Sequence, residues 1–126
     1  MVTISELRKL IEQSDGAFLK HTFSENEIKE AEGTRNRFSY FAGRFAVKEA
    51  VFKAIAHLTP EHSFDFRIVE TLKQPDGSPR LQKNEKLAII CDNAGVSNIL
   101  VSISNEGDFA IAVAQAVCDS GAKKKL

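Results

Sequence analysis

The spacing of apolar residues predicts two helices near the N-terminus. The apolar face of the first helix consists of Ile4, Leu7, Leu10 and Ile11. These positions recur every three or four residues, which is the period of an α-helix. Each helix is preceded by a hydroxyl residue with a glutamate three positions later, Thr3 with Glu6 and Ser24 with Glu27. This arrangement is typical of a capping box. Gly33 is the predicted end of the second helix.

A third, longer helix is predicted from about residue 37 to residue 57, stopped by Thr59 and Pro60. At about 100° per residue, one stripe of this helix is apolar. The stripe consists of Phe38, Phe41, Ala42, Phe45, Ala46 and Phe52. Glu49 and Lys53 fall in the middle of it, and an unpaired buried charge is costly. These two side chains therefore need a reason to be there.

Alternating apolar and polar residues replace the helical period in the second half of the chain. Residues 63–73 alternate in this way and predict a half-buried strand. The further predicted elements are a turn at 75–79, a short strand at 80–82, a helix at 83–95 closed by Gly95, and two strands at 97–104 and 108–117 that form a hairpin.

The last strand has two distinct faces. One carries Phe109, Ile111, Val113 and Val117, and the other carries Ala110, Ala112, Ala114 and Ala116. A helix can approach a face made only of methyl groups closely. The order of elements therefore predicts an α+β fold in which an antiparallel sheet packs against helices.

Composition is consistent with one globular domain. Of 126 residues, 43% are hydrophobic and 27% charged, enough to bury a core, and we assign residues 1–118 to this domain and 119–126 to a disordered basic tail. Seventeen basic residues balance seventeen acidic ones, which gives no indication of a nucleic-acid or membrane partner. Cys91 and Cys118 lack metal-ligand spacing and are interpreted as reduced thiols of a cytoplasmic protein.

Positive charge is concentrated on and before the long helix. The basic residues there are Arg35, Arg37, Arg44, Lys48 and Lys53, against Glu49 alone. This cluster favours an anionic ligand. The structural alternative for Glu49 and Lys53 is an ion pair across one helical turn, and for Arg44 and Lys48 it is a solvated face.

The segment GRFAVKEAVFKA (43–54), together with SISN (102–105), resembles the holo-acyl-carrier-protein synthases, which are 4′-phosphopantetheinyl transferases. Weaker matches follow in family order at FSENE (23–27) and DGSP (76–79). The resemblance implies transfer of the phosphopantetheine arm of coenzyme A to a serine of an acyl-carrier protein, as in fatty acid biosynthesis. It also implies a homotrimer with active sites between subunits.

The resemblance assigns roles to individual residues. Glu49 would bind Mg²⁺ and could act as a base, and Lys53 would reach the phosphates. The residues expected to contact coenzyme A are Arg44, Lys48, Lys53, Gly77, Pro79, Ser102, Ser104 and Asn105. Positive charge for the carrier protein would come from Arg8, Lys9 and Lys20, with His21 at a position where the family commonly has arginine.

The sequence departs from the family pattern in two further places. Family members begin with a strand that ends in a Gly-x-Asp motif, whose aspartate is a second metal ligand. Matching MVTISEL to the residues after that aspartate places the ligand just before Met1, so the first strand is expected to be missing. Asp65 is the alternative second ligand. Asn105 replaces a family histidine and can donate a hydrogen bond, but it cannot carry a charge.

These departures leave two other functions open. One is a catalytically degenerate relative that binds coenzyme A or a carrier protein without transfer. The other is a domain that only assembles through its apolar faces.

Overall fold

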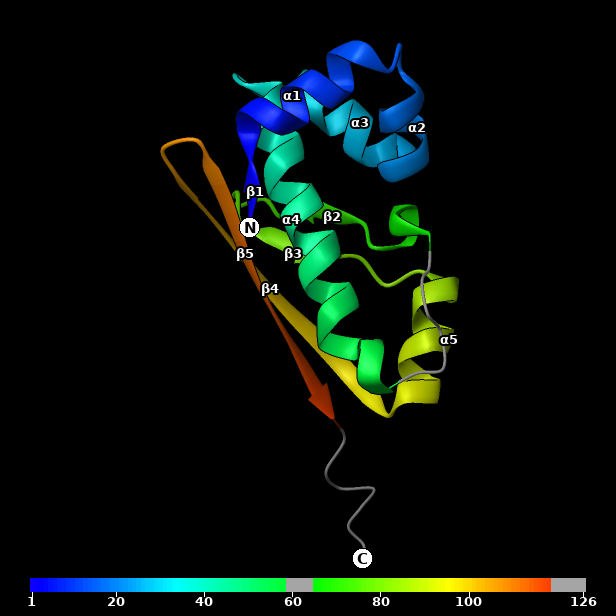
Figure 1. Ribbon diagram of the computed structural model, residues 1–126. Coiled ribbons are helices and arrows are strands. Elements are labelled where there is room, and N and C mark those ends of the chain that lie inside the picture. The colour runs from blue at the N-terminus through cyan, green and yellow to red at the C-terminus, as the bar shows by residue number, and fades with distance from the viewer. Residues whose placement is uncertain (59–64, 119–126) are drawn as a thin grey trace, which may run out of the picture.

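The computed structural model describes residues 1–58 and 65–118, and it consists of helices packed on an antiparallel sheet (Figure 1). The helices are α1 (Ile4–Gln13), α2 (Ala17–Thr22), α3 (Glu25–Glu32), α4 (Arg37–Ile55) and α5 (Glu85–Ala94), with 3₁₀ turns η1 (Ala56–Leu58) and η2 (Phe66–Ile68). The strands are β1 (Val2–Thr3), β2 (Thr71–Lys73), β3 (Pro79–Leu81), β4 (Val96–Glu106) and β5 (Phe109–Cys118). The predicted α+β class is confirmed.

The main sheet has the order β1-β5-β4, and β2 and β3 form a separate two-stranded ribbon. Helix α4 runs along one face of the main sheet, with α1, α2 and α3 at one end of it and α5 near the other (Figure 1). β1 pairs with β5 in antiparallel register, Val2 opposite Ala110 and Thr3 opposite Phe109. The expectation that the first strand is missing is therefore wrong, because two residues of it are present.

Two hydrophobic clusters flank α4. The first joins it to the N-terminal helices through Leu7, Ile11, Phe23, Phe41 and Ala42, among others. The second joins its C-terminal half to the sheet through Val47, Val51, Ile55, Val69, Val96 and Ile99. The alanine face of β5 turns inward as predicted, with Ala110 buried and Ala112, Ala114 and Ala116 packed against the second cluster.

The two predicted capping boxes have different outcomes. In α3 both bonds are present: the Glu27 amide donates to the Ser24 hydroxyl at 3.1 Å, and the Ser24 amide donates to the Glu27 carboxylate at 3.0 Å. In α1 the Thr3 hydroxyl donates to Glu6 and caps no backbone group. Asp108, from the β4–β5 turn, caps this helix instead, since its carboxylate accepts from the Ser5 amide at 3.1 Å.

The predicted strand at 63–73 is mostly wrong. Residues 66–68 form a 3₁₀ turn and β2 begins only at Thr71, because the Asp65 carboxylate accepts from the Arg67 amide at 2.9 Å and bends the chain. Residues 63 and 64, like Thr59 and Pro60 and the tail at 119–126, lie outside the described residues. Helix α2 was not predicted, since its short sequence offers no clear period.

The other elements agree with the sequence to within a few residues. α5 ends at Gly95, whose φ of 75° is in the left-handed region that favours glycine. The β4–β5 hairpin turns at Gly107 and Asp108. Within the described residues, no helix is both long enough and apolar enough to cross a lipid bilayer.

Candidate functional site

Helix α4 does not bury the two charges that the sequence placed in its apolar stripe. Lys53 is exposed and Glu49 is half-buried, whereas Arg44 and Lys48 are buried. The interpretation of Arg44 and Lys48 as a solvated face is therefore wrong. The apolar stripe did not predict which charges are buried, because α3, β2 and η2 cover a second side of α4. On that side, Arg44 and Lys48 contact polar groups of these elements.

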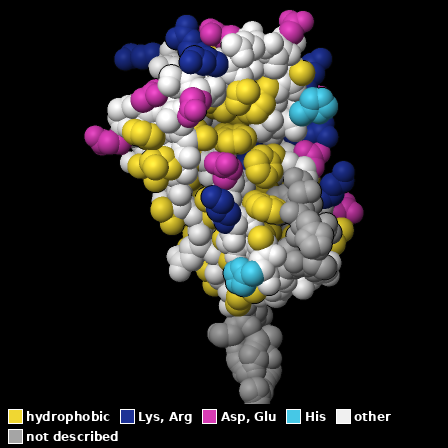
Figure 2. Space-filling model, in the orientation of Figure 1, with side chains coloured by type: hydrophobic (Ala, Val, Ile, Leu, Met, Phe, Trp, Pro, Cys, Tyr) yellow, Lys and Arg dark blue, Asp and Glu magenta, His cyan; other side chains and the backbone are white. Residues whose placement is uncertain are grey.

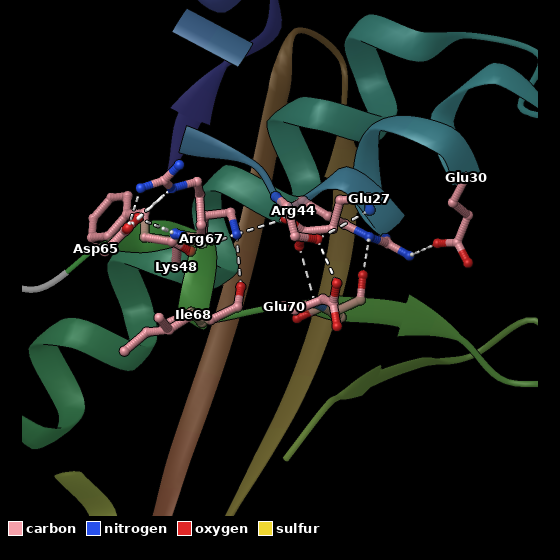
Figure 3. Close-up of polar contacts among 12 residues, drawn as sticks. Glu27, Glu30, Arg44, Lys48, Asp65, Arg67, Ile68 and Glu70 are labelled. Atoms are coloured by element: carbon pink, nitrogen blue, oxygen red, sulfur yellow. Dashed lines mark hydrogen bonds and ion pairs between the residues drawn. The ribbon is translucent and has the colours of Figure 1, made fainter. Parts of the chain in front are cut away.

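Lys48 lies at the centre of a buried polar cluster (Figure 3). Its ammonium donates to the Glu27 carboxylate at 2.8 Å and to the carbonyl oxygens of Phe66 at 2.8 Å and Val69 at 2.7 Å. Glu27 also accepts from the Thr71 amide at 3.0 Å. Burial raises the pKa of Glu27 and lowers that of Lys48, because loss of water disfavours each charged form, and the ion pair between them opposes both shifts.

Arg44 makes a second link between the same elements. Its guanidinium donates to Glu30 at 3.2 Å and to the carbonyl of Thr71 at 3.1 Å, and it lies 4.3 Å above the ring of Tyr40. Tyr40 in turn donates to Glu30 at 2.7 Å. Burial, together with this hydrogen bond to Glu30, raises the pKa of Tyr40.

These contacts change the interpretation of two predicted coenzyme A ligands. All three protons of Lys48 are used inside the protein, and the residue has no exposed surface. Lys48 is therefore a structural residue in this conformation, and we no longer assign it to the ligand. Glu27, the partner of Lys48, and Glu30, the partner of Arg44, were missed as functional neighbours, although their spacing of three on a predicted helix was a signal that they share one face.

Arg44 keeps a connection to the surface. It lines an open hollow between α4 and β4 together with Gly43, Ser39, Lys73 and Asn105. The Asn105 amide donates to the Ser39 hydroxyl at 3.0 Å, so its side chain is turned toward α4. The structure therefore brings together two of the predicted coenzyme A residues, Arg44 and Asn105.

Other predicted coenzyme A residues lie elsewhere. Ser102 and Ser104 are exposed on β4, where their side chains alternate with the inward-facing Ile103. Gly77 is in the exposed turn before β3, and Pro79 lines a separate hollow between β3 and β4 that also includes Lys73. In a single chain these residues are not gathered into one pocket.

Glu49 and Lys53 remain the charged pair on the open side of α4. No ion pair within 4.0 Å joins them in the described part of the structure, so the structural alternative of a pair across one turn is not observed. In the same part of the chain, no hydrogen bond engages the Glu49 carboxylate. Figure 2 shows this side of the molecule, where a few charged side chains stand among hydrophobic ones.

The basic residues predicted to meet a carrier protein are all exposed. Arg8 and Lys9 are on α1, and Lys20 and His21 are at the end of α2. Arg8 is partly engaged, since it pairs with Glu12 at 3.2 Å and lies 4.9 Å from the ring centre of Phe38. These four residues belong to the end of the molecule formed by the N-terminal helices (Figure 1).

The side chains that could bind a metal ion do not form a complete ligand set in the described residues. No group of three acidic, histidine or cysteine side chains is close enough to hold a metal within residues 1–58 and 65–118. Asp65, the alternative second ligand, is occupied by Arg67 at 2.6 Å, which lowers the pKa of its carboxyl. The residues present therefore do not fit a magnesium site built from protein carboxylates alone.

Comparison with known proteins agrees with the fold. A profile described as the 4′-phosphopantetheinyl transferase superfamily matches residues 1–114. A holo-[acyl-carrier-protein] synthase of Desulforudis audaxviator is 32% identical over 125 residues, covering 99% of this chain and 94% of that protein.

Solved structures show the same architecture. The holo-[acyl-carrier-protein] synthase of Neisseria meningitidis superposes with a TM-score of 0.81 at 24% identity, over 91% of each chain. The Helicobacter pylori enzyme of the same name, in complex with coenzyme A, gives 0.75 at 27% identity, over 91% of this chain and 94% of that one. With the profile match across nearly the whole described fold, these results show that the chain belongs to the 4′-phosphopantetheinyl transferase superfamily.

Proposed function

We propose that this protein transfers 4′-phosphopantetheine from coenzyme A to a serine of an apo-acyl-carrier protein. The observation that carries the proposal is Glu49, a half-buried carboxylate on α4 that no described side chain neutralises, with Lys53 one turn away. A carboxylate kept unpaired beside a lysine is suited to accept a proton next to a phosphate. The relatives named as synthases, and a relative solved with coenzyme A, support the substrate class.

In the proposed reaction, the serine oxygen attacks the phosphorus that carries the pantetheine. The bond between that phosphorus and the bridging oxygen of the pyrophosphate breaks, and adenosine 3′,5′-bisphosphate leaves. Glu49 accepts the serine proton, a role that typically contributes a factor of about 10² to 10⁴ in rate. Lys53 offsets negative charge on the phosphates as a point charge.

The hollow at Arg44 and Asn105 is the proposed contact for the nucleotide end of coenzyme A. It contains a cation, the Arg44 guanidinium, and an amide donor in Asn105, and both can donate to phosphate oxygens. Gly77, Pro79, Ser102 and Ser104 are not part of the lining of this hollow, and we propose that they contribute from a neighbouring subunit of a homotrimer. We place the protein in the cytoplasm, where both substrates would be found.

Magnesium is part of the proposal only in a limited form. Glu49 is the predicted ligand, and an ion bound there would act as a Lewis acid on the pyrophosphate. Because the described donor set is incomplete, the roles above are assigned to the residues of this chain alone. The Arg8, Lys9, Lys20 and His21 surface is proposed to steer an acidic carrier protein toward the site.

The second candidate is a relative that binds coenzyme A or a carrier protein without transfer. Asn105 favours it, because an amide cannot supply the charge that the family histidine can carry. Under this alternative, coenzyme A would bind and the carrier protein would stay unmodified.

Replacing Glu49 tests the proposal directly. Glu49→Gln keeps the size of the side chain and removes its ability to accept the proton, so we expect the transfer rate to fall by at least about 100-fold. Mass spectrometry of the carrier protein after incubation with coenzyme A and Mg²⁺ measures the added arm. Glu32→Gln, an exposed glutamate on α3, is the matched control and should transfer at the wild-type rate.

Undiminished transfer by Glu49→Gln would contradict the assigned role. If the wild-type protein binds coenzyme A in calorimetry but modifies none of the carrier proteins offered, the second candidate function is the correct one.

A further inference from the structure

The first strand ends at a threonine where this family is expected to present a metal ligand. β1 pairs with β5 through Val2 and Thr3, and α1 begins at the next residue, Ile4. The resemblance described above places an aspartate at the end of the first strand, immediately before the first helix. The family profile also matches from residue 1 onward. The end of β1 therefore places the position of that aspartate at Thr3 rather than at the residue just before Met1.

The surroundings of Thr3 connect it with the α4 site. Thr3 and Glu6 line a surface hollow together with Phe45 of α4, and Glu49 follows Phe45 by one helical turn. Residues four apart lie on the same face of a helix, so Glu49 continues the face that the hollow exposes. A longer acidic side chain at position 3 would lie on the same side of the molecule as Glu49.

The donor chemistry at this position is poor for a hard divalent cation. A threonine hydroxyl is neutral, and Thr3 donates its proton to the carboxylate of Glu6. Mg²⁺ and Mn²⁺ favour carboxylate oxygens, and affinity depends on the number of charged ligands. Among the described residues, Glu49 is the one carboxylate of α4, and Glu6, which lines the hollow from α1, already accepts the Thr3 proton.

We propose that Thr3 stands in the position of the second carboxylate ligand, so that this protein binds a divalent cation weakly on its own. The inference rests on the proposed function for the location of the metal. It goes beyond that function in one respect: the incomplete set of metal ligands is caused by the side chain at position 3 alone, and one substitution there should complete it. The strand, the helix start and Glu49 are otherwise in place.

The experiment is a Mn²⁺ titration of the full chain without coenzyme A, followed by electron paramagnetic resonance of the free ion. Thr3→Asp should lower the dissociation constant for Mn²⁺ at least about tenfold relative to wild type, which corresponds to about 1.4 kcal/mol of binding free energy. Thr3→Asn is the matched control, since it has nearly the same shape without the charge, and it should leave the constant unchanged. Aspartate is also a favourable residue before a helix, so the variant should fold.

A double variant tests whether the ion binds at the stated place. Adding Glu49→Gln to Thr3→Asp should abolish the gain in affinity, whereas adding Glu6→Gln should preserve it. The proposal is overturned if Thr3→Asp binds Mn²⁺ no more tightly than Thr3→Asn, or if the gain survives Glu49→Gln. Because the probe is the metal alone, these results are independent of whether the wild-type protein transfers phosphopantetheine.

Discussion

At the scale of single residues, the ion pair of Lys48 and Glu27 is the most consequential polar contact. Neither side chain has exposed surface, and together they bind backbone groups of η2, the residue that follows it and β2. A buried pair of this kind contributes little net stability compared with apolar residues, but loss of one partner leaves the other charge unpaired. The stability of the fold therefore depends on both members being present.

We predict that Lys48→Met lowers the free energy of unfolding by about 3 to 5 kcal/mol. The methionine fills similar space, so the loss comes mainly from the unpaired Glu27 and from the carbonyl oxygens left without a donor. Urea unfolding followed by circular dichroism measures the change. The control is Arg8→Ala, which removes an exposed ion pair and should cost less than about 1 kcal/mol.

Adding Glu27→Leu to Lys48→Met should recover part of this loss, since no charge then remains buried. A Lys48→Met variant as stable as the wild type would contradict the importance assigned to this pair.

At the scale of secondary structure elements, α4 determines where the site residues lie. Its inner side packs against β4 and β5, its second side carries Arg44 and Lys48 toward α3 and β2, and its open side carries Glu49 and Lys53. α4 approaches β4 closely at Gly43. A Cβ atom there would be 3.0 Å from Cγ2 of Ile103, which is shorter than an ordinary contact.

We predict that Gly43→Val is less stable than Gly43→Ala by about 2 to 3 kcal/mol. Alanine needs only a small shift of Ile103 and gains helix propensity, whereas valine adds two methyl groups to a space that is already filled. Thermal unfolding of both variants measures the difference. The control is the exposed position 53 of the same helix, where Lys53→Val should be less stable than Lys53→Ala by only about 0.6 kcal/mol. Equal differences in stability at positions 43 and 53 would contradict a close approach of α4 to β4 at Gly43.

At the scale of the whole molecule, the outer face of the hairpin is unusually apolar for a surface. Leu100, Phe109, Ile111, Val113 and Val117 are all exposed, and Val113 has 62% of its surface accessible. A large exposed apolar surface commonly marks an interaction site. Together with the resemblance, it supports the proposal that copies of this chain assemble through the β4–β5 face.

If the proposed trimer forms through this face, Val113→Asp should shift the protein to a monomer, because a charge at the centre of an apolar interface is costly to desolvate. Analytical ultracentrifugation measures the mass of both proteins. Lys86→Asp on α5, an exposed residue outside the hairpin, should leave the assembly unchanged. A wild-type protein that sediments as a monomer at micromolar concentration would exclude the trimer.

Local sequence determined most of the secondary structure. Ser24 with Glu27 indicated the start of α3, Gly95 the end of α5, and the alternating alanines of β5 a surface for a helix. Each of these features depends on residues close together in the chain, so that its physical cause can be found in a short stretch of sequence. The motif on α4, together with SISN (102–105), likewise identified the superfamily that the profile match confirmed.

The tertiary structure alone decided which charges are buried. Periodicity predicted the apolar stripe of α4. It could not show that Glu27, 21 residues before Lys48, and Glu30, 14 residues before Arg44, would cover the other side of this helix. The same applies to Thr3, whose place at the end of β1 is defined by pairing with Phe109 across the sheet. Partners brought together by folding lie far apart in sequence, and their burial and pairing therefore emerge only when the chain is packed.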